Sequence, residues 1–233
     1  VTSSLPKEGK SIVALNLATS FAGLGEKTLL IDADLRRGTL HHVFNVPSRP
    51  GVGQLLKNEI TLDQATLQTS EKNLFFIPCG RHVHAASELL ESRAFGELLQ
   101  TLRGQYQRII LDTPPVLGLA ETSSMSKHAD GVLLIIWSGG TAFKAVKTAK
   151  SILDANGAQF FGCVLNKLDL SSATAYYYYY YYSYRYYHAY HAEPEPFHPA
   201  ERLLPISAAQ GTHASADSTE ASDDGTNDDT NKS

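Results

Sequence analysis

Residues 4–11 constrain the fold of this chain more than any other segment. They read SLPKEGKS and match the pattern of a phosphate-binding loop from Gly9 onward, with Ser4 in place of the usual first glycine. Apolar residues recur at helical spacing over residues 11–24, so a helix is expected to begin where the loop ends and to point its N-terminal dipole at the phosphates. An ordinary helix start with a lysine and a serine cap is the alternative.

Such a loop assigns chemistry to particular groups. Backbone N–H groups hold the phosphates, the lysine reaches the β- and γ-oxygens, and the hydroxyl binds magnesium. Lys10 and Ser11 are therefore the central candidates, with ATP and Mg²⁺ as the predicted cofactors. The predicted ATP-binding part of the loop consists of Pro6, Lys7, Glu8, Gly9, Lys10 and Ser11.

Two acidic motifs strengthen this interpretation. Residues 29–34 (LLIDAD) and 109–115 (IILDTPP) each predict a short buried strand that ends in a carboxylate. Ligands bind at such strand ends in open α/β sheets, and a carboxylate there can hold magnesium directly or through water. Either aspartate alone could instead cap the next helix. All three motifs in this order favour a nucleotide site.

Strand and helix patterns alternate along the first 170 residues. Strands are predicted over residues 28–32, 74–78, 108–112, 131–137 and 159–166, and helices over residues 87–102 and 143–155. Strands separated by helices imply a parallel sheet covered on both faces. The predicted class is α/β, with a mostly parallel sheet, helices on both faces and a likeness to P-loop NTPases.

Tyrosine is concentrated near the end of the chain, where residues 176–190 contain eleven of the 12 tyrosines. General core packing does not explain so local an enrichment, and together with an ATP site it predicts a phosphoacceptor segment. A sticky β segment, or a platform on which bases or sugars stack, is the alternative. The predicted acceptors are Tyr176, Tyr177, Tyr178, Tyr179, Tyr180, Tyr181, Tyr182, Tyr184, Tyr186, Tyr187 and Tyr190.

The three nucleotide motifs, at residues 4–11, 29–36 and 109–115, and the tyrosine cluster together resemble those of the bacterial tyrosine kinases that govern capsule and exopolysaccharide export. The resemblance covers about residues 1–190. It implies that Lys10 and Ser11 bind phosphate and magnesium, and that Asp34 and Asp112 organise the metal. It further implies that Asp32 is the catalytic base and that Asn166 contacts adenine. An asparagine that ends a strand in a turn is the alternative for Asn166.

Several departures from the family pattern stand out. Lys7 occupies a position where the family commonly has glycine, Gly38 one where proline is common, and Glu121 one where aspartate is usual. The chain also opens on Val1, with few residues before the loop to form the strand that should feed it. We therefore expect a fragment of a longer protein.

The resemblance also implies partners and a location. It implies a ring-like homo-oligomer, a phosphotyrosine phosphatase and an activating membrane-protein segment of the polysaccharide co-polymerase kind, fused upstream or separate. No nucleic-acid partner is expected. The implied location is the cytoplasmic face of the bacterial inner membrane, although the chain has no apolar run of the roughly 18 residues that span a bilayer.

The motifs, the resemblance and the composition together predict three regions: a P-loop kinase domain over residues 1–170, a phosphoacceptor segment over 171–191 and an acidic tail over 192–233. The tail holds nine acidic residues against Arg202 and Lys232, and its polar composition predicts disorder. Cys79 and Cys163 form no C-x-x-C motif and are expected to be core thiols. The nine histidines show no metal-binding spacing, so His41, His42, His82 and His84 are expected to be surface or loop residues and not metal ligands.

The leading hypothesis is an autokinase that moves the γ-phosphoryl group of ATP to a tail tyrosine. Lys10 and magnesium would neutralise the developing charge, and Asp32 would take the tyrosine proton. One rival is a partitioning or positioning ATPase, although many of those carry a lysine where this chain has Leu5. The other rival is a nucleotide-binding scaffold whose tail is phosphorylated by a different kinase.

Overall fold

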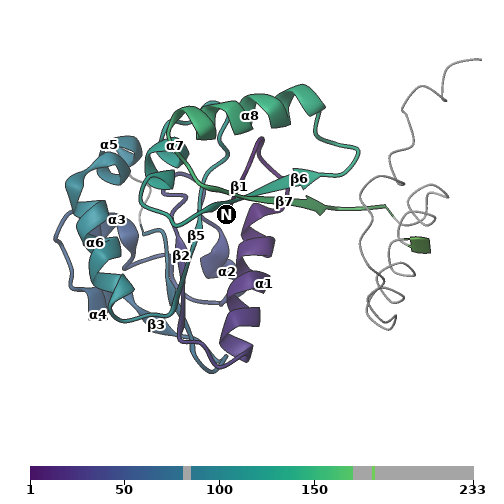
Figure 1. The fold of residues 1–233 in the computed structure, drawn as a ribbon. Helices are drawn as coiled ribbons and strands as arrows, with labels where there is room; N and C mark the ends of the chain where they lie inside the picture. The colour runs from purple at the N-terminus through teal and green to yellow at the C-terminus, as the bar shows by residue number, and fades with distance from the viewer. Residues whose placement is uncertain (81–84, 170–179, 182–233) are drawn as a thin grey trace, which may run out of the picture. The chain divides into compact units, whose positions relative to one another are not determined.

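Strands and helices alternate along the chain in the computed structural model, which describes residues 1–80, 85–169 and 180–181 (Figure 1). The strands are β1 Thr2–Ser3, β2 Thr28–Asp32, β3 Leu67–Gln68, β4 Leu74–Ile77, β5 Arg108–Asp112, β6 Val132–Trp137 and β7 Phe160–Asn166. The helices are α1 Lys10–Gly23, α2 Leu40–Val43, α3 Val52–Leu56, α4 Leu62–Ala65, α5 Ala86–Glu91, α6 Arg93–Arg103, α7 Glu121–Ser126 and α8 Phe143–Ala155.

The strands form two groups that meet at β1. One group has the order β3-β4-β2-β5 and the other β1-β6-β7, and every pairing is parallel except that of β3 with β4. The chain that continues β5 runs beside β1, where the N–H of Thr113 donates to the carbonyl of Val1 at 3.1 Å and that of Val116 to Ser3 at 2.8 Å. Within the described residues the strands therefore follow the order β3-β4-β2-β5-β1-β6-β7.

Helices cover both faces of the sheet around β2. Because successive side chains of a strand point to opposite faces, Leu29 and Ile31 pack in one core cluster with residues of α5 and α6, while Leu30 packs in another with α1. α1 presents the small side chains of Ala14 and Ala18 to the sheet, and Figure 1 shows it on the side opposite α5 and α6. The predicted α/β class, with a mostly parallel sheet, is confirmed.

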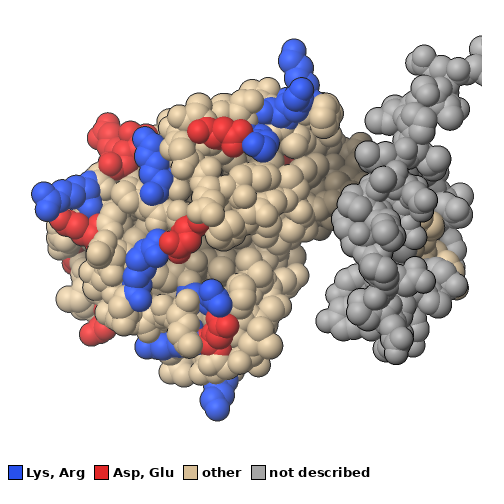
Figure 2. Space-filling view, in the orientation of Figure 1, with Lys and Arg blue, Asp and Glu red and all other residues tan. Residues whose placement is uncertain are grey.

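Charged side chains of both signs are interspersed on the molecular face shown in Figure 2. Several make exposed ion pairs, such as Arg103 with Asp130 at 2.9 Å and Arg93 with Glu97 at 2.7 Å. Exposed pairs of this kind contribute roughly 0–1 kcal/mol each. The apolar layers on either side of the sheet are therefore the main source of its stability.

The strand predictions were accurate, whereas one helix prediction was wrong. The five predicted strands lie within one residue of β2, β4, β5, β6 and β7. The single helix predicted over residues 87–102 is two helices, because Ser92 is extended, with φ −69° and ψ 156°. Its hydroxyl donates to the carbonyl of Leu89 at 2.7 Å, a local bond that competes with helix continuation. β3 and the short helices α2, α3, α4 and α7 were not predicted.

The expectation of two core thiols holds for one cysteine. Cys79 is buried after β4, but Cys163 is exposed on β7, so the prediction for Cys163 was wrong. Alternate residues of β7 face outward, including Phe161 and Leu165 on the side of Cys163. The predicted region boundaries at residues 171–191 and 192–233 concern parts of the chain that, apart from residues 180–181, lie outside the described residues.

Among the helices of the described residues, none is both long enough and apolar enough to cross a bilayer.

Candidate active site

The predicted phosphate loop connects β1 to α1 at the junction of the two strand groups. Gly9 precedes α1 with φ +94°, a conformation that favours glycine, and a Cβ there would lie 2.1 Å from the amide nitrogen of Asn166. No side chain of the described residues caps the helix that begins at Lys10. The first-turn N–H groups of this 14-residue helix therefore face the loop, as anion binding at a helix N-terminus requires.

Glu8 braces the loop from inside. Its side chain is only 1% exposed and accepts hydrogen bonds from the N–H of Leu5, at 2.9 Å, and from the hydroxyl of Thr141. The side-chain amide of Asn166 donates to the carbonyl of Glu8 at 2.9 Å, and Lys167 Nζ donates to the carbonyl of Lys7 at 2.6 Å. The loop is thus fixed to the ends of β6 and β7. A direct contact of Glu8 with ATP and of Asn166 with adenine remain predictions.

Lys7 adopts a left-handed backbone conformation, with φ +67°. It occupies the loop position at which the family commonly has glycine. A side chain in this conformation costs roughly 1–2 kcal/mol, although glycine loses more entropy on folding. We expect Lys7→Gly to raise the free energy of unfolding by about 1 kcal/mol, measured by urea titration without nucleotide.

Lys57→Gly is the matched control, because Lys57 has φ −89° and no backbone strain to relieve. This change should lower stability slightly. Equal effects of the two substitutions would show that φ at Lys7 carries no strain.

Four predicted site residues converge around one ammonium group. Lys10 Nζ lies 3.3 Å from Asp34 Oδ2, 3.8 Å from Asp112 Oδ1 and 3.3 Å from Ser11 Oγ. The sheet brings them together because β2 and β5 are parallel neighbours that pair Asp32 directly with Asp112 at their carboxyl ends. Asp32, Asp34 and Asp112 outnumber the one ammonium group, and this excess of acidic groups favours a bound cation.

The donor set fits magnesium. Both carboxylate oxygens of Asp112 are buried and accept no hydrogen bond from the described residues at normal geometry. Burial raises the pKa of Asp112, and the charge of Lys10 only partly opposes this rise. A cation would favour the ionised form, and the hard oxygen donors of Asp112, Asp34 and Ser11 are of the type that Mg²⁺ prefers.

Asp32 lies beside this group and is fully buried. Its Oδ1 accepts from the N–H of Asp34 at 3.3 Å and its Oδ2 from the N–H of Leu40 at 3.2 Å. Burial, followed by the charge of Asp112, raises the pKa of Asp32 to about 7. A carboxylate with a pKa near neutrality can both accept and release a proton, as the predicted base must.

This raised pKa predicts a pH-dependent stability. Asp32 holds its proton up to about pH 7 in the folded protein but loses it near its ordinary pKa of 3.8 when unfolded. Its contribution to the free energy of unfolding therefore falls as pH rises through this window, by up to about 1.4 kcal/mol per pH unit. Asparagine does not titrate in this range. The free energy of unfolding of Asp32→Asn should therefore rise relative to that of the wild type as pH increases from about 4 to about 7.

Urea unfolding of both proteins at several pH values, without nucleotide or metal, measures this difference. Comparing the two cancels the titration of groups that do not interact with Asp32. A difference that stays constant across the window would contradict the raised pKa of Asp32.

An ion pair missed by the sequence reasoning lies next to the site. Arg36, two residues after Asp34, donates to Glu121 at 2.7 Å and to the hydroxyl of Ser87 at 3.2 Å. Glu121 is 1% exposed, so its replacement of the usual aspartate preserves a buried acceptor for Arg36. The pair ties the segment after β2 to α7. Motif spacing gives no signal for this contact or for that of Thr141.

Comparisons with known proteins agree with the geometry. A family model described as an AAA domain matches residues 8–154. The tyrosine-protein kinase YwqD of Bacillus subtilis is 37% identical over 176 residues, which cover 76% of this chain and 74% of YwqD. The crystal structure of the VpsO kinase domain superposes with a TM-score of 0.69 at 38% identity, over 72% of this chain and 83% of that domain.

Some relatives are much longer. The tyrosine-protein kinase Wzc of Salmonella typhimurium is 32% identical over 176 residues, which are 76% of this chain but 24% of Wzc. From these matches to tyrosine kinases, and from the convergence of the predicted residues at one site, we conclude that the chain belongs to the family of bacterial tyrosine kinases.

Proposed function

We propose that this chain is an autokinase that moves the γ-phosphoryl group of ATP to tyrosines of residues 176–190. One observation carries the proposal: Lys10 Nζ lies within 4 Å of both Asp34 and Asp112, at the N-terminus of a helix suited to phosphate. Of the predicted acceptors, only Tyr180 and Tyr181 are described, and their side chains are 62% and 47% exposed.

The chemistry assigns a role to each group. A tyrosine oxygen attacks the γ-phosphorus, the bond from that phosphorus to the bridging oxygen breaks, and ADP leaves. Asp32 takes the phenolic proton, which is useful because the free pKa of tyrosine is near 10. Lys10 stabilises the charge on the transferred group. Ser11, Asp34 and Asp112 would hold magnesium, which supplies further charge neutralisation when bound.

The cellular role is inferred from the relatives. We propose that the kinase regulates exopolysaccharide or capsule synthesis and export at the cytoplasmic face of the inner membrane. The length of relatives such as Wzc, of which this chain covers 24%, is consistent with an activating membrane segment that is fused in some proteins and separate in others. A homo-oligomer and a phosphatase that resets the tail complete the proposed cycle.

Labelled ATP tests the reaction directly. Purified chain with γ-labelled ATP and Mg²⁺ should place label on tyrosine within residues 176–190, identified by peptide mapping. Label released as free phosphate, without phosphotyrosine, would instead support the positioning-type ATPase. Nucleotide binding with neither product, in the presence of a candidate activating segment, would support the scaffold.

A further inference from the structure

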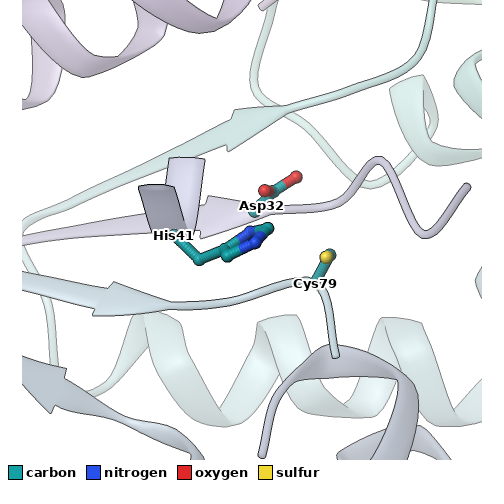
Figure 3. Close-up of side chains that lie close together, drawn as sticks. All are labelled: Asp32, His41 and Cys79. Carbon is teal, nitrogen blue, oxygen red and sulfur yellow. The ribbon is translucent and has the colours of Figure 1, made fainter. Parts of the chain in front are cut away.

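Three potential metal ligands meet next to the active site, from segments far apart in the sequence (Figure 3). Asp32 ends β2, His41 lies in α2, and Cys79 follows β4; one donor atom of each lies within 4.8 Å of the other two. Asp32 and Cys79 are buried, whereas His41 is half-buried. Spacing along the chain could not predict this cluster, because its three members come from separate segments that only the folded sheet brings together.

Each of the three side chains has an atom that can still bind a ligand. His41 Nδ1 is buried and has no hydrogen-bond partner among the described residues. Cys79 Sγ makes one hydrogen-bond contact within the described part of the chain, with the carbonyl of Gly80 at 3.5 Å. Each carboxylate oxygen of Asp32 accepts one backbone N–H, and a carboxylate oxygen offers two lone pairs. A buried imidazole nitrogen without a hydrogen-bond partner costs free energy unless something binds it.

Gly38 provides room at the cluster. A Cβ on Gly38 would lie 2.6 Å from both Asp32 Oδ2 and Cys79 Sγ, closer than real Cβ atoms come. The family commonly has proline, which carries a Cβ, at this position. The glycine therefore allows the carboxylate and thiol of this chain to approach each other.

We propose that Asp32, His41 and Cys79 form a second metal site, for a borderline-soft divalent ion such as Zn²⁺. Thiolate and imidazole select such ions, whereas the oxygen donors of Ser11, Asp34 and Asp112 suit magnesium. Zinc bond lengths place tetrahedral ligand atoms about 3.4–3.6 Å apart, so small side-chain rotations close the cluster. The thiol proton passes to solvent as the sulfur–metal bond forms, and the fourth position is left for water.

The position of this site implies inhibition. The positive charge of an ion on Asp32 would lower the proton affinity of the carboxylate that, in the proposed function, accepts the tyrosine proton. Binding of the ion itself does not depend on kinase activity, but its inhibitory effect rests on the proposed function. The two consequences can therefore be tested separately.

Cobalt titration tests the binding. Co²⁺ replaces zinc at such sites, and a thiolate ligand gives it a charge-transfer absorption that histidine or carboxylate ligands alone do not. Untagged protein with excess Mg²⁺ to fill the oxygen site should develop this band. Cys79→Ser should lose it, and His41→Gln or Gly38→Ala should weaken cobalt affinity at least about tenfold.

Neighbouring residues supply matched controls. Cys163→Ser removes the other cysteine, which is exposed on β7, and His42→Gln changes the exposed histidine next to His41. Both should titrate like the wild type. A band that survives Cys79→Ser, or that disappears equally in Cys163→Ser, would overturn the site. Thermal unfolding of each variant without metal verifies that it is folded.

A kinase assay tests inhibition. Zn²⁺ should suppress phosphotyrosine formation in the wild type, and Cys79→Ser should need at least about tenfold more Zn²⁺ for the same suppression. If cobalt binds as expected but Zn²⁺ inhibits both proteins equally, the inhibitory role is wrong. If no phosphotyrosine forms without zinc even in the presence of an activating segment, the proposed function fails while the cobalt band still reports on the site.

Discussion

Lys10→Met should reduce autophosphorylation by about 10³-fold or more while the protein remains folded. Methionine preserves the length of the side chain but removes the ammonium group, which lies 3.3 Å from Asp34 and 3.8 Å from Asp112. Phosphoryl transfer depends mainly on positioning and on neutralising charge, and single groups that do this contribute factors of about 10³–10⁵. Label on tyrosine, measured against time at saturating ATP, gives the rate.

Lys57→Met is the matched control, since Lys57 is exposed at the end of α3. It should phosphorylate at the wild-type rate. Lys10→Met leaves two buried carboxylates without their cation, which could destabilise the fold. Circular dichroism and thermal unfolding therefore establish whether this variant is folded. Wild-type label incorporation by a folded Lys10→Met would remove the assignment of the phosphate loop.

Replacing all eleven tyrosines of residues 176–190 with phenylalanine should abolish nearly all label incorporation. The change keeps most of the aromatic area but removes every acceptor of the cluster. Full phosphorylation would add roughly −16 to −22 charges, enough to drive neighbouring tails apart. In ATP and Mg²⁺ the wild type should therefore shift to smaller species in light scattering, whereas the variant should stay associated.

Tyr106→Phe is the control for this experiment. Tyr106 is the one tyrosine outside the cluster, and its ring packs edge-on against Phe75 at 5.5 Å with Lys27 Nζ 4.7 Å from its centroid. Its loss should leave label incorporation unchanged. Dissociation of both wild type and cluster variant in ATP would mean that nucleotide turnover, and not tail phosphorylation, controls assembly.

A mixture of two variants separates transfer within a chain from transfer between chains. A Lys10→Met chain supplies acceptors without activity, and a chain lacking residues 176–190 supplies activity without acceptors. The resemblance favours transfer to a neighbour, so label should appear on the Lys10→Met chain. No label under conditions in which the wild type phosphorylates itself would indicate transfer within one chain.

Much of the site could be predicted from the sequence because its residues belong to short local patterns, and one rule of parallel sheets says where those patterns meet. A loop followed by a helix defines Lys10 and Ser11, and buried apolar runs that end in aspartate define Asp34 and Asp112. Parallel strands bring their carboxyl ends to one edge, so these residues had to converge once the strands were neighbours. The structure confirms that convergence through the contacts of Lys10.

Contacts between distant segments could not be predicted in this way. Glu8 bonds Thr141 across 133 residues, and Asn166 reaches back 158 residues to the same glutamate. Neither contact leaves a periodic signal, since each depends on how the ends of β6 and β7 meet the loop. The cluster of Asp32 and Cys79 with His41 has the same origin, because only the folded sheet places the ends of β2 and β4 side by side.

The position of β1 gives nucleotide binding a second consequence. This strand joins the two halves of the sheet, and the phosphate loop begins at its end. A ligand held by that loop is bound only when both halves are docked, so ligand affinity and sheet cohesion are thermodynamically linked. At a hundredfold excess over its Kd, a nucleotide would add about 2.7 kcal/mol to the stability of the joined sheet. The concentration of nucleotide would then set how stable the joined sheet is, independently of any phosphate transferred.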